Sequence, residues 1–193
     1  MLLFVFDYPL KEFNRFRFAI HQAMILPKER DPRFITTRRG GTLTDSNHRL
    51  LALWAADCAE HVLHLFEQVN ADDKRPREAI ALTRAWVKGE ITMKQAHKAA
   101  FAANAAGKGM PDAARFAALA AGQAVAVAHV AAHELGAAAY AIRAVGEAVG
   151  ENAKELMAKE CEWQRDQLPD DIRELVLDDQ KLRNHLCWFV FAC

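Results

Sequence analysis

Apolar residues recur every three to four positions along most of the chain after residue 45, the spacing that gathers them on one face of an α-helix. Segments with this spacing are expected to form helices at about 46–69, 76–89, 92–107, 111–150, 151–167 and 168–182. The closing segment CWFVFAC is expected to form a strand or an apolar tail packed on the helices. The pattern predicts an all-α protein, a compact bundle or short stack of five to seven helices.

Capping residues support several of these boundaries. Thr92 and Gln95 have the spacing of a capping box, so a helix is expected to begin there. Pro76 suits the first turn of the preceding helix, which Gly89 would end. Alanine dominates between residues 96 and 149, and side chains this small allow helix axes to approach closely.

The beginning of the chain is less regular. Residues 34–44 (FITTRRGGTLT) contain two β-prone pieces around Gly40 and Gly41, which predicts a short β-hairpin or an extended lead-in. We expect residues 1–30 to be an N-terminal appendage, or in part an over-extended start since Met24 precedes the DPRF motif, and residues 31–193 to be a single helical domain.

Charge and cysteine content limit the expected partners and the expected compartment. The 25 Lys and Arg residues equal the 25 Asp and Glu residues, so no overall field would draw the protein to nucleic acid or an acidic membrane, and neither is an expected partner. The four cysteines form no CxxC pair and no signal peptide is evident, so reduced thiols in the cytoplasm are expected.

The helix expected at 46–69 separates its side chains into two faces. At about 100° per residue, an arc of about 200° contains only apolar side chains, among them Trp54 and Cys58. Asp57, Glu60, His61 and His64 fall together on the remaining stripe, with Leu50 and Leu53. This stripe is either a solvated face with Asp57–His61 and Glu60–His64 pairs, or a partly covered polar cluster.

A second polar stripe follows from extending the alanine-rich helix through residues 111–150. It would align Gly122, His129, His133, Gly136, Tyr140, Arg143 and Glu147. His129 and His133, four positions apart, have the spacing at which one helix offers two imidazoles to a metal. Carboxylates or histidines from the first stripe could complete a divalent metal site, for which Asp57, His61, His129 and His133 are the candidate ligands. No cofactor is otherwise expected.

Arg75 and Arg77 flank Pro76 at a helix start, where free backbone N–H groups favour anions, although a solvated loop with local Asp–Arg pairs is the favoured interpretation. The sequence contains no GxSxG, P-loop, dinucleotide-binding or zinc-finger motif, so no enzyme class is indicated and an enzyme is not the favoured reading.

Four separated strings resemble the bacterial immunity-five-like domain family, whose members are labelled putative immunity proteins. They cover residues 31–63, 72–92, 128–145 and 168–191, beginning DPRFITTRRGG, DDKRPREAIAL, AHVAAHELGAA and LPDDIRELVLD. The resemblance implies a cytoplasmic antidote that binds and blocks a toxin of an interbacterial system. The positions similar to the family's shared polar ones are Trp54, Asp57, Cys58, Glu60, Arg75, Arg77, His129, His133 and Tyr140.

We therefore expect an immunity-type protein that binds and neutralises a protein toxin. The expected partner- or ligand-binding residues are Trp54, Asp57, Glu60, His61, Arg75, Arg77, His129, His133 and Tyr140. The alternative is a helical enzyme, or a metal- or small-ligand-binding protein, that uses a His/Asp/Glu cluster between helices. A third hypothesis is a helical scaffold that forms homo-oligomers through its alanine and glycine faces.

Overall fold

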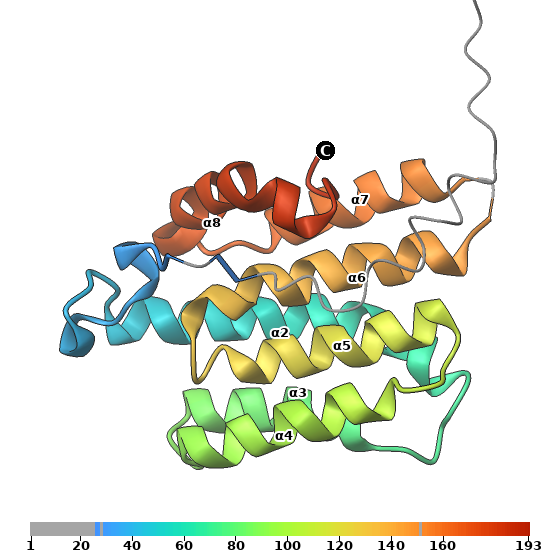
Figure 1. The fold of residues 1–193 in the computed structure, drawn as a ribbon, viewed down its shortest axis with the longest axis horizontal. Helices are drawn as coiled ribbons and strands as arrows, with labels where there is room; N and C mark the ends of the chain where they lie inside the picture. Colours follow the sequence, from blue (N-terminus) through green and yellow to red (C-terminus); the bar gives the residue numbers. More distant parts are fainter. Residues whose placement is uncertain (1–25, 28, 151) are drawn as a thin grey trace, which may run out of the picture.

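The computed structural model describes residues 26–27, 29–150 and 152–193. Within these residues the chain forms seven α-helices and no β-strand, labelled as in Figure 1: α2 (Asp45–Glu67), α3 (Arg75–Val87), α4 (Met93–Ala106), α5 (Asp112–Ala126), α6 (Glu134–Ala148), α7 (Ala153–Asp166) and α8 (Asp170–Arg183). The predicted all-α bundle of five to seven helices is confirmed. The Thr92–Gln95 capping box is present at the start of α4.

The helices lie roughly parallel or antiparallel in three layers (Figure 1). Helices α7 and α8 form one outer layer, α3 and α4 the other, and α2, α5 and α6 lie between them. Helix α5 packs against α2, α3, α4 and α6, and ten of its fifteen residues are buried. The small alanine and glycine side chains of α5 permit this close packing: a Cβ added at Gly122 would come within 3.2 Å of the Ala100 carbonyl oxygen of α4.

The single helix predicted over residues 111–150 is wrong. Helix α5 ends near Val127, the chain turns, and a 3-10 turn (Ala131–His133) leads into α6, which returns antiparallel to α5. The backbone of Val130 is extended, with φ −138° and ψ 113°, although no glycine or proline marks the break. The reversal buries the alanine faces of both halves against each other, which a straight helix of about 60 Å could not do.

The hairpin predicted at residues 34–44 is not confirmed. This lead-in forms two 3-10 turns, Pro32–Phe34 and Thr37–Arg39, and a single bridge between Thr36 and Leu43. The expectations for an appendage over residues 1–30 and an over-extended start fall largely on residues 1–25, which lie outside the described residues.

The C-terminal segment is a tail packed on the helices, one of the two expected forms. Val190 and Phe191 are buried, and the Arg165 guanidinium of α7 donates to the carbonyl oxygens of Phe191 and Cys193. The structure joins Cys161 of α7 to Cys193 in a disulfide, so the expectation that all four cysteines are reduced is wrong for this pair. The fold brings together two cysteines that are 32 positions apart, which their spacing did not suggest.

Candidate functional site

The polar stripe of α2 lies where the helical wheel places it. The apolar arc, including Trp54 and Cys58, is buried, whereas Asp57, Glu60, His61 and His64 are exposed. The stripe is not free of contacts, because α3 and α7 each place side chains against it. It therefore combines the two expected forms, a solvated face that is partly covered.

Arg84 of α3 holds the two carboxylates of this stripe together. Its Nη2 atom donates to Asp57 Oδ1 at 2.7 Å and to Glu60 Oε2 at 2.6 Å. Both carboxylate side chains are about half exposed, so water weakens these ion pairs. The pairs hold the three side chains in position but add little to the stability of the fold. The Asp57–His61 and Glu60–His64 pairs expected within the helix are replaced by contacts between helices.

His61 contacts α7 instead. Its ring stacks on Trp163 with centroids 3.7 Å apart, and its Nδ1 lies 2.7 Å from Oε2 of the buried Glu160. The Gln164 amide of α7 donates to the other oxygen of Glu160 at 2.8 Å. Glu160 was not predicted, because its role depends on α7 packing against α2 and no local motif indicates that contact.

Trp54 is a structural anchor of the same contact. The side chain is 1% exposed, and its Nε1 donates to the Gln164 carbonyl oxygen at 2.8 Å. It cannot contact a partner protein directly without unfolding of this region. Its part in any surface is to hold α7 against α2.

The Arg-Pro-Arg corner is internally neutralised. Arg75 Nε donates to Asp73 Oδ1 at 2.9 Å, and Arg77 donates two hydrogen bonds of 2.6 Å to Glu67. Hydrogen bonds from these arginines lower the pKa values of the Asp73 and Glu67 carboxyls. The corner therefore has the geometry of the solvated Asp–Arg interpretation, with its guanidinium groups exposed and fixed in position.

The two polar stripes do not meet. His48, near the start of α2, lies 2.7 Å from the Val127 carbonyl oxygen, which places the α5–α6 turn at that end of α2. His61 is 13 positions further along, which at 1.5 Å per residue is about 20 Å away. The hypothesis that His129 and His133 join Asp57 and His61 in one cluster is therefore wrong, because it required the helix that breaks at Val127.

Each histidine of the second stripe has a different environment. His133 Nδ1 lies 2.7 Å from the Gln123 side-chain oxygen, and burial lowers its pKa to about 4. His129 lies beside His97, with ring centroids 4.7 Å apart, and its buried Nδ1 has no hydrogen-bond partner. Across the described ranges, no three His, Cys, Asp or Glu side chains are grouped in a way that could hold a metal ion.

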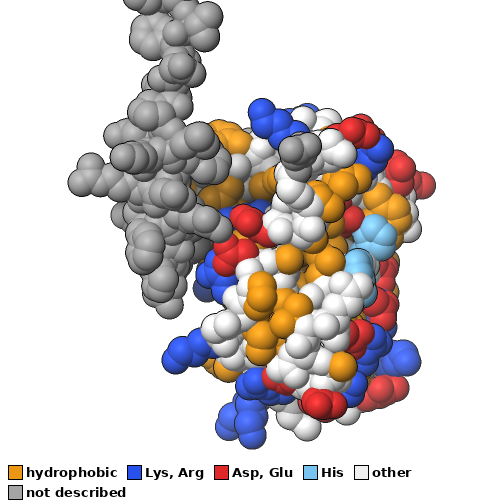
Figure 2. Space-filling view, turned by 90° about the vertical axis from the view of Figure 1, so that its right-hand side faces the viewer, with side chains coloured by type: hydrophobic (Ala, Val, Ile, Leu, Met, Phe, Trp, Pro, Cys, Tyr) orange, Lys and Arg blue, Asp and Glu red, His pale blue; other side chains and the backbone are white. Residues whose placement is uncertain are grey.

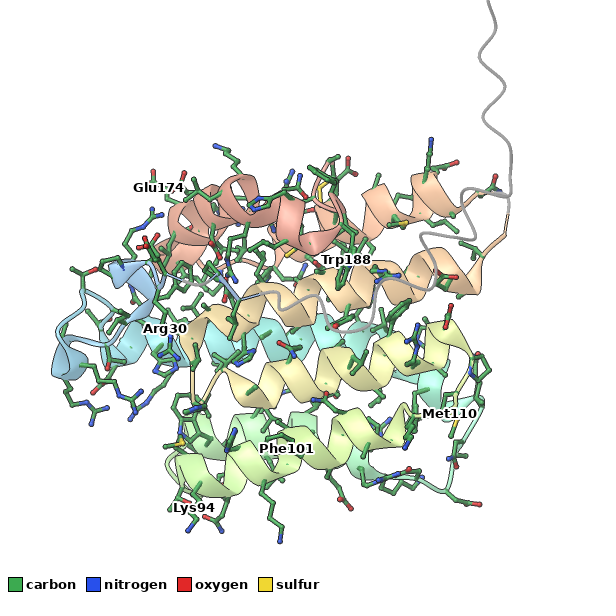
Figure 3. The ribbon with its side chains drawn as sticks, in the orientation of Figure 1. Arg30, Lys94, Phe101, Met110, Glu174 and Trp188 are labelled. Atoms are coloured by element: carbon green, nitrogen blue, oxygen red, sulfur yellow. A yellow bond between two sulfur atoms is a disulfide. The ribbon has the colours of Figure 1, made fainter. Side chains whose placement is uncertain are left out.

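Tyr140 belongs to an aromatic cluster remote from both histidines. Its ring lies 5.9 Å from Phe116 and 5.3 Å from Trp188 between centroids, and the Arg143 guanidinium lies 4.0 Å from the Phe116 ring centre. Burial raises the pKa of Tyr140. Trp188, labelled in Figure 3, brings the C-terminal segment against α6 here.

A buried charged cluster that the sequence did not indicate ties α6 to α8. Arg183 donates to Asp179 at 2.7 Å and to Glu134 at 3.1 Å, and all three side chains are at most 6% exposed. Burial raises the pKa of Glu134 well above its ordinary value. One guanidinium thus faces two acids, an arrangement suited to binding a single shared proton.

A basic pocket is the other feature that was missed. It has a volume of about 460 Å³ and lies where the lead-in, the start of α2, the end of α3, the start of α4 and the α5–α6 turn converge. Its basic lining residues are Arg30, Arg38, Arg39, His48 and His129. Figure 3 shows Arg30 at this end of the bundle. The three arginines lie within ten positions of one another, but further lining residues come from four other segments, so only the fold reveals the cavity.

Elsewhere the surface carries mixed charge. Figure 2 shows basic and acidic side chains interspersed over the end of the bundle it faces, with apolar side chains between them. No helix in the described ranges is both long and apolar enough to cross a membrane.

Comparison with known protein families identifies the family of this chain. Residues 41–171, more than half of the chain, match the family described as Imm-5 like putative immunity protein. No curated protein and no solved structure is significantly similar to the chain. The matched segment begins just before α2 and ends within the first turn of α8.

Proposed function

The chain belongs to the Imm-5 like putative immunity protein family, and on that premise we propose that it binds a cognate protein toxin and blocks it. The family match over residues 41–171 is the observation that carries this proposal. The matched segment contains α2 to α7 entire, so it includes the helices that present the exposed polar residues described above.

The surface we propose for the toxin is the α2–α3 face, made up of Asp57, Glu60, His61, Arg75, Arg77 and Arg84. Its side chains are exposed or partly exposed, and each charged group is held by a partner within the protein. Fixing long side chains before association lowers the entropic cost of binding. Alternating acids and arginines also favour one partner over others, because a mismatched surface would place like charges together.

Arg84 is the centre of this face. It lies between Asp57 and Glu60, and its side chain is 32% exposed. An arginine that is already oriented by two carboxylates can offer its remaining N–H groups to a partner carboxylate or carbonyl, and arginines are enriched among the residues that dominate protein interfaces.

The alternative of an enzyme or metal protein built on a shared His/Asp/Glu cluster is not retained. It depended on His129 and His133 lying beside Asp57 and His61, and the α5–α6 turn that carries these two histidines lies about 20 Å along α2 from His61. Homo-oligomer formation stays a prediction, and light scattering over a range of concentrations would test it.

A growth-protection assay tests the proposal. The gene is co-expressed with the toxin candidate encoded beside it, and survival is compared with cells that express the candidate alone. Protection by the wild-type chain, together with co-purification of the two proteins, is the expected result. If the neighbouring genes encode no protein toxic to the cell and no toxin co-purifies, the proposal is wrong.

Charge-reversal variants locate the surface. Asp57→Lys with Glu60→Lys would leave Arg84 unpaired and is expected to weaken toxin binding at least about 100-fold, as loss of a central charged anchor does. The matched control is Glu174→Lys, an exposed acid of α8, which lies in the outer layer remote from α3 (Figures 1 and 3). Equal weakening of toxin binding in the double variant and in Glu174→Lys would place the interface elsewhere.

A further inference from the structure

The basic pocket carries positive charge that ion pairs among the described residues do not neutralise. No aspartate or glutamate is among the described residues that line it. Arg38 pairs with Asp45, the first residue of α2, at 2.9 Å. Arg30 and Arg39 have no ion pair or hydrogen bond from their side chains among the described residues, unlike the paired arginines of the α2–α3 face.

The walls of the pocket are apolar beneath this rim. Phe34, Ile35, Trp86, Met93 and Val130 line it together with alanines of the α5–α6 turn. Trp86 packs its ring against His48, with centroids 4.9 Å apart, so one wall presents a fixed aromatic surface. A volume of about 460 Å³ falls in the range of sites for small organic ligands.

Histidine groups add polar atoms at the base. The His48 Nε2–H donates to the Val127 carbonyl oxygen at 2.7 Å, and burial lowers the pKa of His48, which favours the neutral ring. His129 Nδ1 is buried without a partner, a state that is energetically costly for a polar atom. A ligand that pairs this atom after rotation of the ring would recover that cost.

We propose that this pocket binds a small organic anion, whose phosphate or carboxylate group is held by Arg30 and Arg39 and whose planar apolar part lies against Trp86 and Met93. Two unpaired guanidinium groups and no carboxylate give a local positive potential in a chain of zero net charge. Guanidinium groups bind both anions through paired N–H donors. The apolar walls favour a ligand that has an apolar part over a bare inorganic ion.

The pocket shares no residue with the α2–α3 face, so this inference does not depend on the proposed toxin binding. Arg30 and Arg39 are exposed and their side chains form no hydrogen bond or ion pair with the described residues, so their substitution is expected to leave folding intact. Each proposal can therefore fail without affecting the other.

Titration calorimetry with phenyl phosphate and with benzoate tests the inference, and inorganic phosphate and phenol serve as the charged and the apolar half-ligands. Phenyl phosphate, benzoate or both are expected to bind at least about tenfold more tightly than either half-ligand, with a Kd below about 1 mM. The better probe identifies the anionic group. Binding is expected to change the fluorescence of Trp86, and the change should disappear in Trp86→Phe.

Arg30→Gln and Arg39→Gln are each expected to weaken binding about tenfold, as loss of one charge-assisted contact does. Lys154→Gln, which removes the same charge from the exposed start of α7, is the matched control and should bind as the wild type does. Absence of binding by both probes at about 10 mM, equal affinity for a probe and inorganic phosphate, or unchanged affinity in both arginine variants would overturn the inference.

Discussion

His133, a partly buried histidine of the α5–α6 turn, should make the stability of the protein depend on pH. Burial, followed by nearby positive groups, lowers the pKa of His133 from 6.5 to about 4. The neutral ring is held by the Gln123 side-chain oxygen 2.7 Å from Nδ1, which the N–H of one tautomer satisfies. In the unfolded chain this ring is solvated and titrates normally.

The sign of the effect follows from which state binds the proton. Between pH 6.5 and about 4 the unfolded chain protonates His133 and the folded chain does not, so the free energy of unfolding falls as the pH falls through this window. At about 1.4 kcal/mol per pH unit, lowering the pH from about 7.5 to about 5 covers about 1.5 units of that window and should remove about 2 kcal/mol.

Other groups titrate as well, and the comparison must separate them. Glu134, whose pKa burial raises, acts in the opposite direction, because the folded state holds its proton and gains stability as the pH falls. Hydrogen bonds from arginines lower the pKa values of Asp31 and Asp73. The stability that these two carboxylates contribute to the folded protein is lost only below about pH 4. The informative quantity is thus the loss of unfolding free energy on acidification, compared between the wild type and a variant that lacks the imidazole.

Urea unfolding of wild type and His133→Asn at about pH 7.5 and about pH 5 measures that difference. The asparagine amide can donate to Gln123 but does not titrate, so the variant should lose about 2 kcal/mol less than the wild type on acidification. His64→Asn, at an exposed histidine of α2, is the matched control and should follow the wild type. A wild-type loss equal to that of His133→Asn would refute the reasoning.

Three further predictions concern stability. Trp54→Phe removes a buried N–H that bonds a carbonyl of α7 and should cost about 1–3 kcal/mol in urea unfolding; an unchanged midpoint would contradict this. Cys193→Ser opens a disulfide that spans 32 positions and should cost about 3–4 kcal/mol, and a reducing agent should then have no further effect on the variant. Gly122→Leu would force α4 and α5 apart and should lower stability by about 3 kcal/mol, whereas a wild-type melting temperature would show that the contact is not tight.

The sequence was sufficient wherever the determining interactions are local. The helical spacing around Trp54 separated the buried face of α2 from the exposed residues Asp57 and Glu60, because a 3.6-residue period assigns each side chain to a face. The capping box at Thr92 located the start of α4 for the same reason, since its hydrogen bonds join residues three positions apart.

The sequence failed where a contact depends on packing between helices. The break at Val127 carries no glycine or proline, and it forms because α6 gains more by packing on α5 than by extending it. The stack of His61 on Trp163 and the disulfide of Cys193 join positions that no spacing rule relates.

The sequence by itself thus determined an all-α chain, most of its helix ends, the two faces of α2 and, through separated strings of residues, its family. Only the tertiary structure decided that the two histidine-bearing regions lie at opposite ends of α2, and that Arg30 and Arg39 face a common pocket. The physical reason is one of range: helix propensity and capping act over three or four residues, whereas a binding surface is assembled from segments whose proximity is set by burial of the whole core.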